Sequence, residues 1–124
     1  MGARAHLPRQ VPIDAYGNGG FRFGGMSHKG SILCLPSGIW EWSVASAEAL
    51  DRTALDDALA PGAGVSLMFL GTGTRLVRPP ADLRAACATA GIALEAMDTG
   101  AAARTYNMLL AEGRAVAAAL IAVP

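Results

Sequence analysis

Residues 65–90 read VSLMFL GTGT RLVRPP ADLRAACATA, and this stretch decides the fold class. The apolar run at 65–70 ends in a glycine-rich segment at 71–74, which is typical of a buried strand followed by a tight turn. After the two prolines, apolar residues recur at three- and four-residue spacing up to Gly91, which indicates a helix and its end. The stretch therefore predicts a strand, a loop and a helix, the first half of a βαβ unit.

The carboxyl-terminal residues continue this pattern. Residues 92–97 are predicted to form a second strand, and Asp98 with Thr99 begins a second helix that runs to about residue 112. Residues 115–123 contain many alanines, which favour a helix, but the break at Gly113 and the β-branched ending favour a strand. We therefore expect the order β-α-β-α-β after residue 64.

The amino-terminal half has the two-residue alternation of strands. Glycine- and proline-containing turns separate the runs, which predicts a β-hairpin layer. The expected strands are 11–16, 21–23, 26–29, 31–35 and 39–44. A short helix is expected at 53–59, with Thr53 as its N-cap. Residues 1–10 have no periodicity and are expected to be a flexible tail before a single α/β domain at 11–124.

Composition limits the kinds of partner. The chain has 124 residues with 52% hydrophobic and 16% charged, which indicates one folded domain with a large core. Its formal net charge of zero argues against binding nucleic acid through general electrostatics. The acidic residues concentrated at 41–57 and the basic ones at 1–30 are interpreted as ordinary solvated charges. Neither a secretory signal nor a membrane-spanning segment is expected, so we predict a cytoplasmic protein.

One constellation qualifies as a candidate site. If strands 65–70 and 92–97 are parallel neighbours, the residues that follow them meet in one crevice, where open α/β sheets bind ligands. Arg104, one to two turns into the second helix, is placed to reach it. The candidate residues are Gly71, Thr72, Gly73, Arg75, Asp98, Thr99 and Arg104. The N-cap role of Asp98 and Thr99 is the competing structural explanation.

Other chemistry is poorly supported. Gly71 and Gly73 resemble a phosphate-binding loop only weakly, because Leu76 stands where a third glycine is needed. His6 lies in the expected tail and His28 in an expected turn, so the two form no predicted metal site. The two cysteines, Cys34 and Cys87, are interpreted as packed thiols. We therefore expect no cofactor and no catalytic residues.

The sequence resembles the family of the mitochondrial complex I assembly factor 3 and its bacterial and archaeal relatives, most of which belong to a domain of unknown function. The resemblance covers nearly the whole chain after residue 10. It rests on residues 70–73, 91–95, 112–114 and 118–121, and on Tyr16, Gly20, Phe21, Gly30, Trp42, Arg75, Asp98, Thr99, Ala103, Thr105, Tyr106, Asn107 and Leu109. It implies a three-layer α/β fold with a central mixed sheet and an extra β layer.

The resemblance also implies a non-enzymatic role. In the mitochondrial case this is assembly of the NADH:ubiquinone oxidoreductase, so possible partners here are subunits or assembly factors of the respiratory NADH dehydrogenase. Mitochondrial members carry a targeting segment and this chain begins with only a short tail, which suggests a bacterial protein. The first hypothesis is an interaction or assembly factor. The alternative is a small-molecule-binding or enzymatic domain that uses the crevice at the carboxyl ends of strands 65–70 and 92–97.

Overall fold

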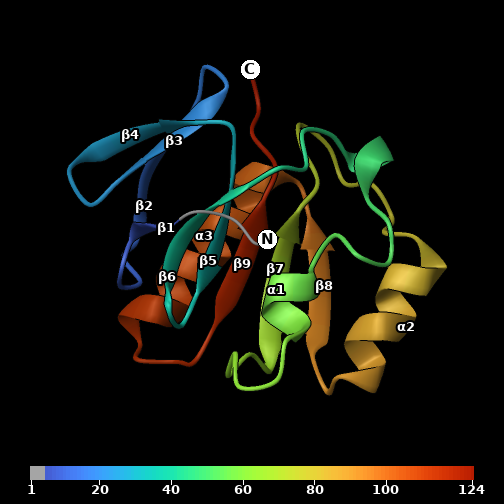
Figure 1. The fold of residues 1–124 in the computed structure, drawn as a ribbon. Coiled ribbons are helices and arrows are strands. Elements are labelled where there is room, and N and C mark those ends of the chain that lie inside the picture. The colour runs from blue at the N-terminus through green and yellow to red at the C-terminus, as the bar shows by residue number, and fades with distance from the viewer. Residues whose placement is uncertain (1–4) are drawn as a thin grey trace.

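A mixed six-stranded sheet forms the centre of the computed structural model, which describes residues 5–124 (Figure 1). Its strand order is β1-β6-β5-β9-β7-β8, and β2-β3-β4 form a second, antiparallel sheet. The strands are β1 Ala5–Leu7, β2 Ile13–Gly17, β3 Gly20–Phe23, β4 Met26–Lys29, β5 Ser31–Leu35, β6 Gly38–Trp42, β7 Leu67–Gly71, β8 Ala93–Met97 and β9 Ala117–Leu120. The helices are the 3-10 turn η1 Ala47–Ala49, α1 Asp56–Leu59, α2 Ala81–Thr89 and α3 Thr99–Ala111.

The carboxyl-terminal half confirms the predicted β-α-β-α-β order. Strand β7 pairs in parallel with β8 on one side and with β9 on the other. On its other edge β9 pairs antiparallel with β5, so the last strand of the chain lies in the middle of the sheet. This position explains why the alanine-rich segment is a strand: both of its edges are hydrogen-bonded, and Ala117, Ala118 and Ala119 are at most 1% exposed.

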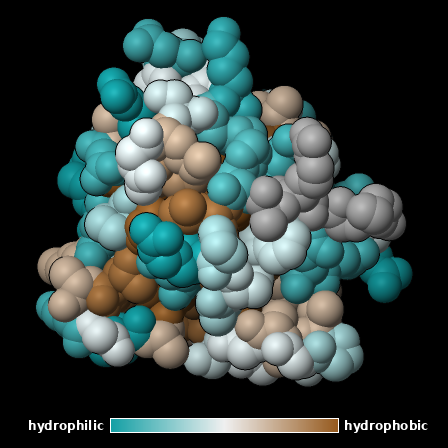
Figure 2. Space-filling model, turned by 60° about the vertical axis from the view of Figure 1, so that its left-hand side comes forward, coloured by the Kyte–Doolittle hydropathy of each residue, from teal (hydrophilic) through white to brown (hydrophobic). Residues whose placement is uncertain are grey.

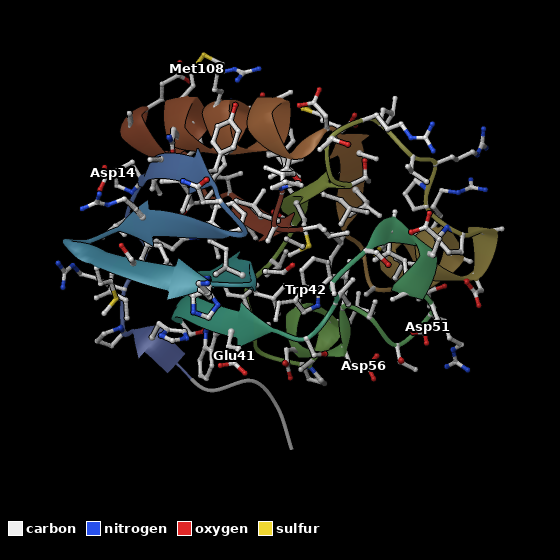
Figure 3. The ribbon with its side chains drawn as sticks, turned by 90° about the horizontal axis from the view of Figure 1, so that it is seen from above. Asp14, Glu41, Trp42, Asp51, Asp56 and Met108 are labelled. Carbon is white, nitrogen blue, oxygen red and sulfur yellow. The ribbon has the colours of Figure 1, made fainter. Side chains whose placement is uncertain are left out.

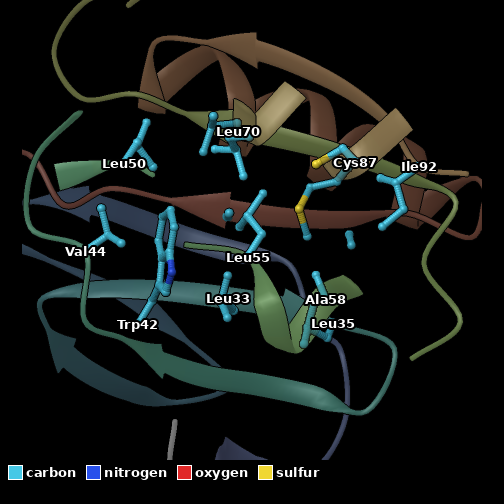
Figure 4. Close-up of a cluster of buried hydrophobic side chains, with 14 of the residues drawn as sticks. Leu33, Leu35, Trp42, Val44, Leu50, Leu55, Ala58, Leu70, Cys87 and Ile92 are labelled. Carbon is cyan, nitrogen blue, oxygen red and sulfur yellow. The ribbon is translucent and has the colours of Figure 1, made fainter. Parts of the chain in front are cut away.

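The central sheet separates two hydrophobic clusters. On one face, α1, α2 and η1 pack with Leu33, Met68 and Leu70 of the sheet (Figure 4). On the other face, α3 and the three-stranded sheet pack against Ile32, Phe69 and their neighbours. Because successive strand residues point to opposite faces, a sheet covered on both sides requires the continuous apolar runs seen in β5 and β7. The result is a three-layer α/β fold with an additional β layer, as predicted.

The tryptophans of β6 lie in the first of these clusters. Trp42 is 6% exposed, and its indole Nε1 donates to the Ala54 carbonyl at 2.9 Å. Trp40 is half-buried and packs against the same cluster, while Glu41 between them is exposed. On the opposite face of β6, Ile39 is fully buried in the second cluster, so only part of that face is exposed to solvent.

Three local predictions in the amino-terminal half are wrong. Residues 5–7 form β1, which pairs with β6, so the expected flexible tail at 1–10 does not extend over them; residues 1–4 lie outside the described part of the chain. The helix expected at 53–59 begins only at Asp56, because Thr53 bonds backward to Asp51 instead of capping it. Residues 26–29 form β4 as expected, so the separate assignment of His28 to a turn is wrong; His28 lies in this strand and is 9% exposed.

The ends of α2 and α3 agree with the sequence analysis. Pro80 is the N-cap of α2 and Asp98 is the N-cap of α3. Gly91 and Gly113, which follow the two helices, have positive φ values of 77° and 78°, as glycines after a helix commonly do. In the part of the chain from residue 5 onward, none of the helices has the length and apolar character needed to span a membrane.

Candidate functional site

The carboxyl ends of β7 and β8 bring most of the predicted crevice residues together. The two strands are parallel neighbours, with Gly71 opposite Met97. Beyond the ladder, Thr72 N–H donates to the Met97 carbonyl at 2.9 Å, and Thr99 N–H donates to the Gly73 carbonyl at 2.8 Å. The loop after β7 and the start of α3 are therefore joined by backbone hydrogen bonds at the predicted place.

The hydroxyls of Thr72 and Thr99 form hydrogen bonds within the protein. Thr99, which is 0% exposed, accepts from Gly73 N–H at 3.0 Å and donates to the Ile121 carbonyl at 2.7 Å through its Oγ1. Thr72 is 3% exposed, and its Oγ1 accepts from Val77 N–H at 2.9 Å and donates to the Arg75 carbonyl at 2.7 Å. Buried hydroxyls with both capacities filled stabilise the loop and offer nothing to a ligand.

Asp98 also has a structural partner. Its carboxylate accepts from Ala101 N–H at 2.9 Å, which is the N-cap interaction proposed as the competing explanation. Replacing such a residue by alanine removes about 1 kcal/mol from the free energy of unfolding. The side chain is half-buried at the first turn of α3.

The two glycines of the crevice are required for different reasons. Gly73 has φ 113°, a conformation that side chains with a Cβ rarely adopt. Gly71 is in ordinary strand geometry, but a Cβ placed on it would lie 2.9 Å from the Thr99 Cα. Gly73 is therefore needed for its positive φ, and Gly71 for the close approach of β7 to α3.

The two arginines of the predicted set face outward. Arg104 is exposed, and its Nη1 donates to the Tyr16 hydroxyl at 3.1 Å. The Tyr16 side chain packs over Gly100, and a Cβ added to Gly100 would collide with the Tyr16 hydroxyl group. Arg75 is exposed on the β7–α2 loop. The predicted constellation thus divides into an inner set bonded within the fold and an outer set of cationic side chains.

Sequence reasoning missed a second set of polar contacts, which joins α3 to the three-stranded sheet. The Asn107 side chain accepts from Ile13 N–H at 2.7 Å and donates to the Ile13 carbonyl at 2.8 Å. The Tyr106 hydroxyl donates to the Val11 carbonyl at 3.0 Å. Tyr106 and Asn107 belong to the residues that carry the family resemblance, and their role in this structure is to hold the layers together. The signal available in the sequence was Asn107 itself, a polar residue within the apolar pattern of the helix.

The two histidines lie side by side between the sheets. The rings of His6 in β1 and His28 in β4 have centroids 4.2 Å apart and are tilted by 59°. Burial, followed by the nearby His6 ring, lowers the pKa of His28 below its ordinary value of 6.5. No group of three or more His, Cys, Asp or Glu residues with metal-binding placement occurs within residues 5–124.

A hollow of about 390 Å³ lies at the other end of the central sheet. It is lined by Leu35, Trp40, Asp57 and Pro61 among others, and it is partly open to solvent. Met108 and the acidic residues lie on opposite sides of the molecule: Figure 3 shows Met108 outside α3 and Glu41, Asp51 and Asp56 on the far side. The residues lining the hollow lie at the β5–β6 turn and before the amino-terminal end of β7, away from the predicted crevice at the carboxyl end of β7.

Known proteins share both this fold and this sequence pattern. A crystal structure described as an outer membrane protein from Bartonella henselae has a TM-score of 0.91 and 46% identity, covering 96% of this chain and 100% of that one. A three-layer α/β domain of this kind therefore has a close structural counterpart. The family described as "Protein of unknown function (DUF498/DUF598)" matches residues 13–121. The chain belongs to this family.

Two curated relatives extend the comparison. An uncharacterized protein of Rhodobacter capsulatus is 38% identical over 117 residues, which are 92% of this chain and 86% of the relative. The human NADH dehydrogenase [ubiquinone] 1 alpha subcomplex assembly factor 3 is 35% identical over 114 residues, 90% of this chain. The match spans only 61% of the human protein. The resemblance to assembly factor 3 and its bacterial relatives is thereby confirmed.

Proposed function

We propose that this protein is a non-enzymatic assembly factor that holds a protein partner during assembly of the respiratory NADH dehydrogenase. The observation that supports this most strongly is the similarity to assembly factor 3 over 90% of the chain. The partner would be a peripheral-arm subunit of that enzyme or another of its assembly factors.

The geometry of the crevice supports a non-enzymatic role. The hydroxyls of Thr72 and Thr99 are bonded within the fold, and Asp98 caps α3. A catalytic site requires a nucleophile or base that remains available to a substrate. The outward-facing Arg75 and Arg104 are better suited to contact a protein surface, where arginine is enriched.

The surface also supports a binding role. In Figure 2, apolar residues extend from the middle of the displayed face toward its lower left, with hydrophilic residues above them and one hydrophilic side chain across them. Apolar areas with polar rims are typical of protein–protein contact surfaces. We propose that the protein acts in the bacterial cytoplasm, which cell fractionation with antibody detection would test directly.

The role in assembly is tested by deleting the gene in the native organism. We expect the deletion strain to contain less assembled NADH dehydrogenase, measured by native electrophoresis with NADH-linked activity staining and by membrane NADH oxidation. The wild-type gene should restore assembly, whereas Arg104→Ala should fold normally and restore it poorly. Arg114→Ala, which changes an exposed arginine after α3, is the matched control and should restore assembly fully. Normal assembly in the deletion strain would contradict the respiratory role.

A crevice that binds a small molecule would give a different result. In that case the purified protein would show saturable turnover or binding of a metabolite, abolished by substitution of Thr72 or Arg104. Such a result would contradict the non-enzymatic proposal, whatever the deletion strain shows.

A further inference from the structure

The β7–α2 loop exposes a leucine between two arginines. Leu76 is 62% exposed, the highest value among the exposed large hydrophobic residues of the described chain. Arg75 and Arg78 on either side are also exposed. The loop leaves the carboxyl end of β7, at the top of the sheet in Figure 1. A single exposed leucine is common on protein surfaces, so its meaning depends on the loop around it.

The loop has a fixed backbone although it contains no helix or strand. The Thr72 hydroxyl contacts the Arg75 carbonyl at 2.7 Å and the Val77 N–H at 2.9 Å, which encloses Leu76 within one hydrogen-bonded turn. Farther along, Arg84 Nε donates to the Pro79 carbonyl at 3.2 Å, and Pro79 is buried. A loop ordered in advance loses little conformational entropy when a partner binds.

The charges of the loop are uncompensated. Within residues 5–124, neither Arg75 nor Arg78 forms an ion pair or a side-chain hydrogen bond, and Asp82 in the first turn of α2 pairs with neither. A guanidinium group binds a carboxylate through two parallel hydrogen bonds, and it loses less hydration than an ammonium group when it does so. The loop is therefore suited to an acidic partner.

We propose that residues 73–80 form the surface by which this protein docks on its partner, and that the partner presents an apolar pocket rimmed by carboxylates. Leu76 fills the pocket, and Arg75 and Arg78 pair with the acidic rim. At many interfaces a few central, fully desolvated side chains dominate the binding energy, and arginine is enriched among them. This inference rests on the proposed function, because it identifies the contact by which the assembly factor would hold its partner.

Two other occupants fit the loop less well. A membrane surface is disfavoured because one leucine and two arginines provide little anchoring in a chain of zero net charge. In a second copy of this chain, the hollow near Asp57 combines apolar side chains with a carboxylate and could receive the loop. That hollow, however, lies at the end of the sheet opposite to the loop. A head-to-tail contact of this kind is heterologous and leads to rings or open filaments instead of a two-fold dimer.

Photo-crosslinking in living cells locates the contact. A photoreactive phenylalanine analogue is placed at position 76 and, in a matched control, at position 108, because Met108 is similarly exposed at 56% on α3. We expect a specific crosslinked protein at position 76 and a much weaker one at position 108. The crosslinked partner segment, identified by mass spectrometry, should contain Asp or Glu residues around an apolar surface.

Binding measurements then test the chemistry with the purified crosslinked partner. Leu76→Ser and the double variant Arg75→Glu/Arg78→Glu should each weaken binding at least about tenfold, whereas Met108→Ser should leave it unchanged. Reversing the partner's rim carboxylates to lysine should restore binding to the double variant. Affinity should fall as salt is added, because exposed charge pairs are screened.

Several outcomes would overturn the proposal. They are equal crosslinking at positions 76 and 108, affinity that is indifferent to the loop variants, Leu76-dependent binding to vesicles of anionic lipid, and Leu76-dependent self-association in ultracentrifugation. The deletion strain separates this proposal from the proposed function. If assembly requires the protein but the loop variants restore it fully, only the docking surface is wrong. If the loop binds its partner as described and assembly is normal without the protein, only the respiratory role is wrong.

Discussion

Single polar side chains join α3 to the three-stranded sheet. The Asn107 amide pairs with both backbone groups of Ile13 and so takes the place of a neighbouring strand on the edge of β2. Tyr106 is 0% exposed, and its hydroxyl donates a hydrogen bond to the carbonyl of Val11, two residues before Ile13. These bonds span more than ninety positions in the chain, and each satisfies a backbone group that would otherwise be left without a partner.

Replacement of Asn107 should show the strength of this connection. Asn107→Ala leaves the Ile13 N–H and carbonyl without their partner, and we expect a loss of about 2 kcal/mol in the free energy of unfolding. Urea unfolding followed by circular dichroism measures it. Met108→Ala, on the exposed neighbouring position, should change stability by less than about 0.5 kcal/mol. Equal stability of the two variants would contradict the structural role of Asn107.

The buried thiols should be inert and should make the fold sensitive to alkali. Burial raises the pKa of Cys34 from its ordinary value of 9.0 to about 12, and burial also raises the pKa of Cys87. Above pH 9.0 the unfolded chain therefore releases a proton that folded Cys34 keeps, so the free energy of unfolding falls as pH rises. Each such group contributes at most about 1.4 kcal/mol per pH unit.

Two measurements check these thiols. A thiol reagent should label neither Cys34 nor Cys87 quickly in folded protein and both in urea, and rapid labelling of folded Cys87 would contradict its place on the buried face of α2. In urea titrations at alkaline pH, Cys34→Ala should lose stability less steeply with pH than the wild type. Tyr106, whose pKa burial also raises, remains in that variant and maintains part of the slope.

The loops and strand ends are stabilised by contacts between elements. The β7–α2 turn combines a positive φ at Gly73 with the close approach of Gly71 to Thr99 of α3. Likewise β1 is held at the sheet edge beside β6, where His6 meets His28 from β4. Local sequence indicates each turn, but its geometry is imposed by the element packed against it.

Alanine substitutions in the β7–α2 turn should distinguish its two glycines. Gly73→Ala forces an unfavourable φ and should cost roughly 1 kcal/mol or more. Gly71→Ala overpacks the contact with Thr99 and should cost about 1–3 kcal/mol. Thermal melting compares both with Thr74→Ala, an exposed neighbour that should melt like the wild type. If both glycine variants kept the wild-type melting temperature, the turn would not require either glycine.

Acid should weaken the contact between β4 and β1. Because burial and the His6 ring lower the pKa of His28 below 6.5, the unfolded chain binds a proton more readily than the folded one. The contribution of His28 to the free energy of unfolding is therefore fully present above its ordinary pKa. It is lost as the pH falls, for example from about pH 7 to about pH 5. In an NMR titration, His6→Gln should raise the pKa of His28. An unchanged His28 pKa would show that the His6 ring does not act on it.

In the molecule as a whole, the end of the chain completes the centre of the sheet. Strand β9 pairs with β5 and β7, and Val116 to Ile121 are at most 3% exposed. Within the central sheet, the hairpin β5–β6 and the parallel pair β7–β8 are therefore joined through β9. Both hydrophobic clusters contain residues of this segment.

Truncation tests this dependence. A chain that ends at Arg114 lacks β9, leaves β5 and β7 with unpaired edges, and should not fold; near-ultraviolet circular dichroism and amide NMR dispersion should both be lost. Removal of Pro124 alone, an exposed residue, should leave both signals intact. Native-like spectra for the longer truncation would mean that the two halves fold independently of β9.

The sequence by itself determined the β-α-β-α-β order after residue 64, the ends of α2 and α3, and the family. Those features follow from local periodicity, from the prolines at 79–80 and the glycines at 91 and 113, and from the residues that carry the resemblance. Only the tertiary structure decided that residues 5–7 form a strand, that the crevice hydroxyls are bonded within the fold and that Asn107 binds the edge of β2. The physical reason is that these features depend on hydrogen bonds between residues far apart in the chain, which leave no periodic pattern in the sequence.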